Sequence, residues 1–193
     1  MTTQREFLHR LIALLERTGV PYMVAGSVGS SFYGRPRATQ DVDVVIAPSG
    51  DQLDRLLALL DEEGYYVSPD AARDAFRQRT MFNVIDIGAG WKADLIIRKN
   101  RPFSSEEFRR RMQIETMGRM LWVVSAEDAI LSKLEWAQGR QSEVQRGDAL
   151  AVAVAHLGQL DLQYLAKWAK ELDVEDLLSR LLKEARAQAE GTD

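Results

Sequence analysis

The segment DVDVVI, residues 41–46, most constrains the fold, because it is an apolar strand that begins with two carboxylates. Side chains two residues apart on a strand point to the same face, so Asp41 and Asp43 should share a face with their backbones about 6 to 7 Å apart. Charge in such a strand is costly unless a ligand needs it. Two interpretations stay open: metal ligation by both aspartates, or a turn cap at Asp41 with Asp43 on an exposed edge strand.

Apolar spacing predicts strands early in the chain and helices late. Strands are expected over residues 22–25, 42–47, 81–87, 91–97 and 120–124, the third and fourth forming a hairpin. Helices are expected over 3–18, 26–33, 69–79, 104–112, 126–138, 148–156 and 161–189, the last with a break near Asp173. A further helix is expected to follow a cap at Ser49 or Asp51 and to carry leucines at 53, 56, 57 and 60. The predicted class is α+β, or mixed α/β, with a mixed sheet and flanking helices over 1–124 followed by a helical part over 125–193.

Composition limits the chemistry. The chain has no cysteine and two histidines, which excludes disulfides and thiolate metal sites and leaves oxygen as the expected metal ligand. Twenty-five basic and 29 acidic residues give a net charge of 25 − 29 = −4, so the protein as a whole is not built to wrap nucleic acid. The N-terminal residues 2–19 carry charges throughout and contain no apolar segment long enough for a signal peptide or a membrane span, which predicts a cytoplasmic protein without a membrane partner.

Asp94 interrupts the apolar run at 93–97, where an unpaired charge would be costly. If this strand lies beside 42–46, Asp94 completes a cluster of three carboxylates that could ligate a metal or accept the proton of a hydroxyl. The alternative is a buried ion pair with Lys92 or Arg98, because both lie an even number of residues from Asp94 and share its face.

Gly26 and Ser27 end the first strand and begin a short helix. Glycine lets a bulky anion approach the backbone, the helix N-terminus offers free N–H groups, and the Ser27 hydroxyl adds a donor. Arg35 and Arg37, in the loop that follows, either clamp phosphates or acceptor or are exposed loop charges. Together with the strand at 41–46, these residues predict a site for a nucleoside triphosphate with Mg²⁺ or Mn²⁺.

The order of these motifs, a Gly-Ser pair, DVD fifteen residues after the glycine and a later strand aspartate in ADLII, resembles the polymerase beta-like nucleotidyltransferase superfamily. The segment YGRPRATQDVD is similar to the AbiEii-type toxin group within it. SAEDAILSKLEWAQGR resembles the family helix whose lysine, here Lys133, reaches the triphosphate, and RGDALAVAV resembles the next helix, which opens with Asp148. The pattern covers roughly residues 22–154, and Ala151 departs from it, since members of the group often carry an aspartate there.

The resemblance implies a nucleotidyltransferase that moves a nucleoside monophosphate from a nucleoside triphosphate to a hydroxyl of an acceptor. That acceptor is an RNA such as a tRNA end, a protein or a small molecule, and a cognate toxin or antitoxin protein is an expected partner. The residues expected to act are Asp41, Asp43 and Asp94 in catalysis and metal binding, Gly26, Ser27, Lys133 and Arg37 in nucleotide binding, and Asp148 and Arg35 in support.

Other interpretations stay open. Lys133 lies on an amphipathic helix, where a lysine is commonly exposed to solvent. Asp148 can interact favourably with the helix dipole without any chemical role. The basic runs 98–101 and 109–111 either follow an RNA backbone or are solvated surface. For function, the alternatives are a catalytically silent regulatory or antitoxin binding module with the same fold, and a metal-dependent glycosyltransferase that holds a nucleotide sugar through its DxD motif.

Overall fold

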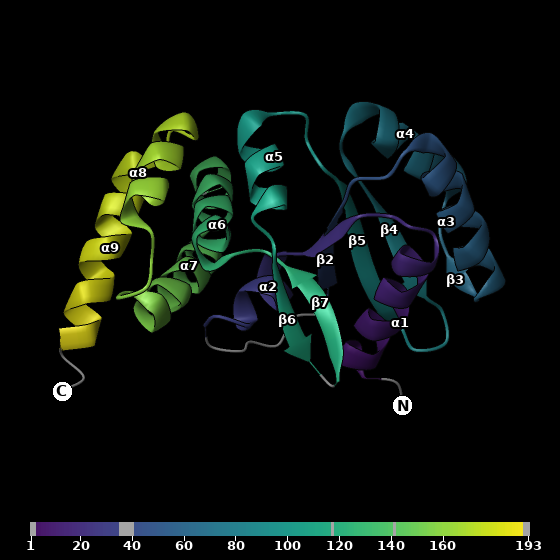
Figure 1. Cartoon of the computed structure of the whole chain (residues 1–193), viewed down its shortest axis with the longest axis horizontal. Coiled ribbons are helices and arrows are strands. Elements are labelled where there is room, and N and C mark those ends of the chain that lie inside the picture. The colour runs from purple at the N-terminus through teal and green to yellow at the C-terminus, as the bar shows by residue number, and fades with distance from the viewer. Residues whose placement is uncertain (1–2, 35–40, 117, 141, 191–193) are drawn as a thin grey trace. The chain divides into compact units, whose positions relative to one another are not determined.

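A computed structural model describes residues 3–34, 41–116, 118–140 and 142–190 (Figure 1). The strands are β1 (Tyr22–Val24), β2 (Asp41–Ile46), β3 (Tyr65–Tyr66), β4 (Met81–Asp86), β5 (Trp91–Ile97), β6 (Met112–Thr116) and β7 (Arg119–Val123). The helices are α1 (Gln4–Arg17), α2 (Gly26–Ser31), α3 (Gly50–Glu62), α4 (Pro69–Gln78), α5 (Pro102–Arg109), α6 (Ala126–Arg140), α7 (Glu143–His156), α8 (Leu162–Glu171) and α9 (Glu175–Glu190). The predicted α+β class with a mixed sheet is confirmed.

Residue contacts group the chain into two compact units. One unit holds the described residues of 1–25 and 38–123, and the other holds those of 26–37 and 124–193. The helix α2 therefore groups with the C-terminal helices, although it lies between two strands of the sheet in sequence. The sequence-based division into 1–124 and 125–193 differs from this grouping by the α2 segment.

The sheet of the first unit has the strand order β3-β4-β5-β2-β1-β7-β6. Two neighbouring pairs are parallel, β2 with β5 and β1 with β7, and the other pairs are antiparallel. Parallel neighbours need a long crossover connection, and residues 47–90, which contain α3 and α4, supply one between β2 and β5. This crossover places residues that are 51 positions apart in sequence, such as Asp43 and Asp94, next to each other in the sheet.

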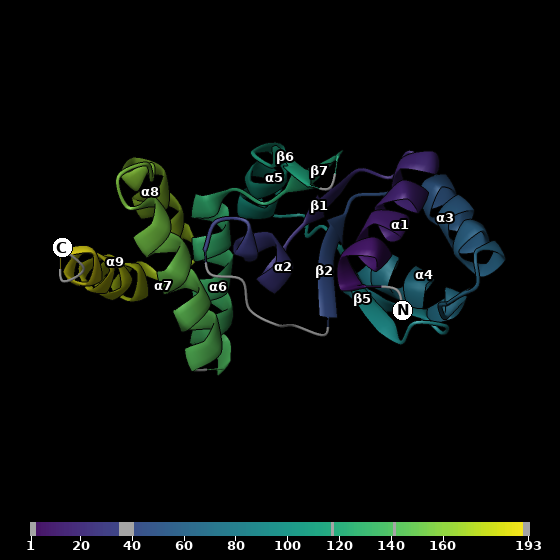
Figure 2. The same ribbon diagram turned by 90° about the horizontal axis from the view of Figure 1, so that it is seen from below.

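The core of the first unit follows from two apolar periodicities. Alternate residues Val42, Val44 and Ile46 of β2 are fully buried, as expected for a strand with one face in the core. The helices α1 and α3, which lie side by side (Figure 2), bury leucines at helical spacing, among them Leu11, Leu15 and Leu56. Both helices begin with a capping box, at Thr3 and at Ser49, which fixes their starts within one or two residues of the prediction.

The sequence-based element map is wrong in three places. Tyr65–Tyr66 forms the short edge strand β3, and Met112–Thr116 forms the edge strand β6, whereas the helix before it ends at Arg109. Short edge strands carry little periodicity, so the pattern of polar and apolar residues does not reveal them. Asp148 does not open a helix, because Ser142 caps α7 and Asp148 is its sixth residue.

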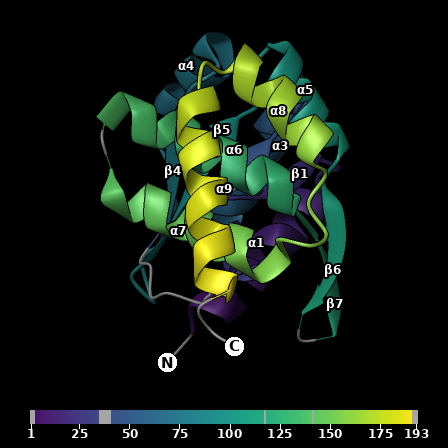
Figure 3. The same ribbon diagram turned by 90° about the vertical axis from the view of Figure 1, so that its left-hand side faces the viewer.

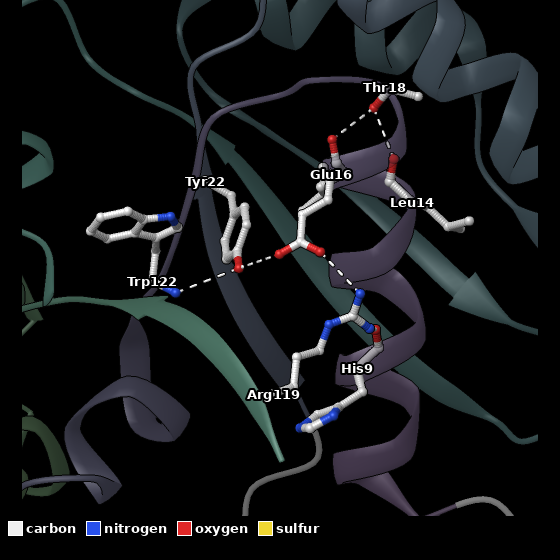
Figure 4. Close-up of polar contacts among 8 residues, drawn as sticks. His9, Leu14, Glu16, Thr18, Tyr22, Arg119 and Trp122 are labelled. Carbon is white, nitrogen blue, oxygen red and sulfur yellow. Dashed lines mark hydrogen bonds and ion pairs between the residues drawn. The ribbon is translucent and has the colours of Figure 1, made fainter. Parts of the chain in front are cut away.

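A polar network ties α1 to β7 within the first unit (Figure 4). The Glu16 carboxylate accepts hydrogen bonds from the Tyr22 hydroxyl at 3.1 Å and from the Arg119 guanidinium at 3.0 Å. Arg119 also donates to the backbone carbonyl of His9 at 3.1 Å. Burial is the first cause that raises the pKa of Tyr22 to about 12, with the Glu16 carboxylate adding to it, so this hydroxyl stays a donor at physiological pH.

The second unit is a group of helices in which α7 packs against α6 and α9 (Figure 3). The start of α6 is fixed by Ser125, whose hydroxyl accepts a hydrogen bond from the Asp128 backbone at 3.2 Å. The predicted break before the last helix is confirmed, because Asp173 has a φ of 58° between α8 and α9. In the described part of the chain, no helix is both long and apolar enough to cross a bilayer.

The position of His9 predicts a pH dependence of stability. Burial, followed by the charges of Arg119 and Arg5, lowers the pKa of His9 below its ordinary value of 6.5. The unfolded chain therefore binds this proton first as the pH falls, so the stabilising contribution is complete above about pH 6.5 and is lost below it. Urea unfolding at pH 8.0 and 5.5 should show a larger loss of stability for the native protein than for His9→Gln. Equal losses would contradict this assignment.

Candidate functional site

The acidic residues of β2 and β5 meet through the parallel register of these strands. Asp43 pairs with Asp94, and Asp41 pairs with Lys92. Opposite residues of neighbouring strands point to the same face of a sheet, so the three aspartates share the face opposite Val42 and Val44. Asp94 is 8% exposed, whereas Asp41 and Asp43 are half-buried. The expectation that the Asp94 strand lies beside the Asp41 strand is thus met by the fold.

Lys92 lies among these carboxylates. Its ammonium is 3.4 Å from Asp41 Oδ1 and 3.3 Å from Asp94 Oδ1. Burial lowers the pKa of Lys92, but hydrogen bonding and attraction to Asp94 and Asp41 outweigh it, so the pKa is raised above 10.5 and the side chain is cationic. The ion pair that the sequence offered as an alternative for Asp94 therefore forms with Lys92. The ion pair is present, and the three aspartates lie on the same face of the sheet.

Sequence reasoning missed Asn83. This residue pairs with Asp94 from the β4 side, so Asp43, Asp94 and Asn83 stand at one level across three strands. The Asn83 side chain is exposed. The signal was available, because Asn83 is the polar residue at the alternating position of the apolar strand MFNVID.

In the second unit, Ser27, Lys133 and Asp148 come together. Lys133 Nζ donates to Asp148 Oδ2 at 2.8 Å and to Gln145 Oε1 at 3.1 Å, and the Ser27 hydroxyl donates to the same Asp148 oxygen at 3.3 Å. Lys133 is 4% exposed. It is therefore not the solvated surface lysine that its helical pattern alone suggested, since a buried ammonium requires partners of this kind.

Helical geometry explains this cluster. Gln145 and Asp148 are three residues apart on α7, so their side chains share one face of the helix. Lys133 comes from α6, which packs directly against α7, and Ser27 comes from α2, which contacts both helices. A short sequence motif could not reveal this arrangement, because it depends on the packing of three helices.

The Gly-Ser turn differs from the sequence-based expectation in one respect. Gly26 has a φ of 57°, a conformation in which glycine is favoured because it lacks a Cβ atom. The helix α2, which begins at Gly26, has only six residues, so its dipole is weaker than that of a longer helix. The Ser27 hydroxyl and the Lys133 ammonium, which both donate to Asp148, are the side-chain donors that the structure brings together in this unit.

The backbone at Gly34 fits closely against α7. A Cβ atom on Gly34 would lie 3.2 Å from the Val152 amide nitrogen and 3.4 Å from the Ala151 Cβ. This contact gives a packing reason for glycine at position 34, because a side chain there would press against the α7 backbone at Ala151 and Val152. The expected phosphate clamps Arg35 and Arg37 lie outside the described residues.

Asp41, Asp43 and Asp94 form what we call the acidic face of the sheet. A divalent cation fits this face only in part. Among the described residues, no three His, Cys, Asp or Glu side chains lie close enough together to hold a metal ion as they stand. Within the same part of the chain, no well-oriented hydrogen bond reaches the buried Asp94 Oδ1, whose ion-pair partner is Lys92. Carboxylate oxygens are the ligands that Mg²⁺ prefers, so Asp43 and Asp94, with Asp41 beside them, are the residues that would hold it.

The chain is similar in fold to solved structures that are described as adenylyltransferases or as nucleotidyltransferase-like. ANT(2″)-Ia in complex with adenylyl-2″-tobramycin aligns over 97% of this chain and 99% of its own at a TM-score of 0.55 and 17% identity. The lincomycin-bound lincosamide antibiotic adenylyltransferase LnuA aligns over 78% of this chain and 96% of its own, with a TM-score of 0.56 and 12% identity. An antigenic nucleotidyltransferase-like protein from Paracoccidioides brasiliensis aligns over 90% of this chain and 89% of its own, with a TM-score of 0.52 and 17% identity.

The chain therefore has the nucleotidyltransferase fold. No protein-family model matches the sequence, and no curated protein matches it either. At these identities, the likeness concerns the path of the backbone. The AbiEii-type assignment stays a prediction from the sequence.

The left-handed backbone conformation of Gly26 predicts that a methyl group added at this position lowers the stability of the protein. Gly26→Ala forces an L side chain into the left-handed region, which should lower the free energy of unfolding by about 1 to 2 kcal/mol. Gly50→Ala is the matched control, because Gly50 is the first residue of α3 and has open space where the added methyl group would lie. Urea denaturation of both variants tests this, and an equal effect at the two positions would contradict it.

The buried position of Lys133 predicts a second, larger effect. Lys133→Met removes the ammonium that pairs with the Asp148 carboxylate, which should cost about 3 kcal/mol of stability. Removing both charges, in Lys133→Met with Asp148→Leu, should recover part of this loss. Lys183→Met, at an exposed position of α9, serves as the control. Chemical denaturation gives the coupling free energy, and a value near zero would place Lys133 in solvent.

Proposed function

We propose that this protein is a nucleotidyltransferase that moves a nucleoside monophosphate from a nucleoside triphosphate to a hydroxyl group of an acceptor. The observation that carries the proposal is the in-register pairing of Asp43 with Asp94, beside Asp41, on one sheet face of a chain with the nucleotidyltransferase fold. A purely structural sheet has no need of three acidic side chains at adjacent positions, because like charges repel.

The proposed chemistry is an in-line displacement at the α-phosphorus. The acceptor oxygen forms a bond to the α-phosphorus, the bond to the bridging oxygen of the β-phosphate breaks, and pyrophosphate leaves with that electron pair. Asp94 is proposed to take the proton of the attacking hydroxyl. Ser27 and Lys133 are proposed to bind triphosphate oxygens, with Asp148 holding the Lys133 ammonium in place.

A divalent cation, Mg²⁺ or Mn²⁺, is part of the proposal. Bound by Asp41, Asp43 and Asp94, it would neutralise the charge that develops on the phosphate oxygens. The support comes from the chemistry of the ligands, three carboxylates on one face with a buried Asp94 oxygen paired only to an ammonium among the described residues.

The nature of the donor and the acceptor is proposed from the structural neighbours. One neighbour is described in complex with adenylyl-2″-tobramycin and another as an adenylyltransferase bound to lincomycin. We therefore propose ATP as the first donor to test, and a small molecule that carries hydroxyl groups as the first acceptor. An RNA or protein acceptor, and a place in a toxin–antitoxin pair, rest on the sequence resemblance alone.

The function predicts the loss of activity in one variant. Asp43→Asn keeps the size of the side chain but removes its charge, and nucleotidyl transfer should fall at least about 100-fold. The assay follows α-labelled nucleoside triphosphates and Mg²⁺ with a panel of aminoglycosides, lincosamides, tRNA and proteins. Asp61→Asn, on the exposed last turn of α3, should keep full activity.

The rival hypothesis is a silent binding module of the same fold. It predicts that a partner binds equally well without divalent metal and in the Asp43→Asn variant, as measured by calorimetry. Transfer by the native protein that persists unchanged in Asp43→Asn would reject the catalytic role of the acidic face.

A further inference from the structure

The acidic face of the sheet contains its own cation. Lys92 stands at the level of Asp41, and its ammonium bridges from Asp41 across to Asp94, at 3.4 and 3.3 Å. On the other side, β4 places Ile85 opposite Lys92, so at this level of the described sheet the ammonium faces a carboxylate on one strand and an apolar residue on the other. The position of Lys92 is therefore set by the strand register and by the two aspartates.

The charges explain why an ammonium is needed there. The pairing places Asp43 and Asp94 directly opposite each other, an arrangement of like charges that destabilises a sheet. Asp94 is also only 8% exposed, and a carboxylate at such a depth requires a compensating charge. Within the described part of the first unit, the Lys92 ammonium is the cation found in ion-pair contact with Asp94.

We infer that Lys92 is a built-in counterion that occupies the cation position of the acidic face until a divalent metal ion enters. The metal part of this inference rests on the proposed function. An ammonium and a divalent cation compete for the same carboxylate oxygens and repel each other, so Lys92 weakens metal binding and stabilises the metal-free protein. The residue thereby sets the metal concentration at which the site fills.

The first test measures Mn²⁺ binding by calorimetry and by electron paramagnetic resonance, without nucleotide. Lys92→Met should lower the Kd for Mn²⁺ about tenfold, because one competing charge is removed. Lys92→Arg retains the charge and should stay within about threefold of the native value, as should Lys99→Met at an exposed position just beyond β5. Unchanged or weaker Mn²⁺ binding by Lys92→Met overturns the inference.

The second test needs no metal. In the presence of a chelator, Lys92→Met should lower the Tm, and Asp94→Asn introduced into that variant should raise it again, since the uncompensated charge is gone. Lys92→Gln provides a second variant if Lys92→Met does not fold. A chelated Lys92→Met protein that is as stable as the native one overturns the counterion role.

One further variant separates this inference from the proposed function. If Asp43→Asn abolishes Mn²⁺ binding while Lys92→Met does not tighten it, the metal site stands and the role of Lys92 is wrong. If neither Asp43→Asn nor Lys92→Met changes Mn²⁺ binding, both the proposed metal site and the inference fail.

Discussion

The parallel pairing of β2 with β5 is the constraint on which the candidate site depends. Because the strands are parallel and in register from Asp41 to Ile46, one alignment fixes the buried face and the charged face together. A slip of one residue would turn Asp94 into the core and Leu95 out of it, which the apolar packing of the sheet opposes. The hydrophobic core thus holds the carboxylates in position, and the register cannot change without loss of stability.

Each unit neutralises the charges of its own candidate site residues. In the sheet, the Lys92 ammonium lies between Asp41 and Asp94, and in the helical unit the Asp148 carboxylate lies against Lys133. Groups that bind a cation or a polyphosphate carry charge. When the ligand is absent, like charges repel one another, and a buried charge costs free energy. Opposite charges supplied by the chain itself stabilise these groups without a ligand, and under the proposed function they compete with the ligand for the same groups.

Much of the fold was predictable because its signals are local. Capping residues at Thr3 and Ser49, the left-handed break at Asp173 and the alternation in β2 all act within a few residues. The pairing of Asp43 with Asp94 could be expected only conditionally, since no local signal states which strands are neighbours. The partners of Lys133 and the packing of Gly34 against α7 depend on segments that are distant in sequence.

The grouping of residues 26–37 with the C-terminal helices has a consequence for any attempt to divide the protein. A fragment that ends near residue 124 would retain α2 but lose α6 and α7, the helices against which it packs. A fragment that begins there would keep α7 but lose the Gly34 backbone that covers Ala151. A division at residue 124 therefore separates α2 from its packing partners, so a boundary between the units has to keep the described residues of 26–37 together with those of 124–193.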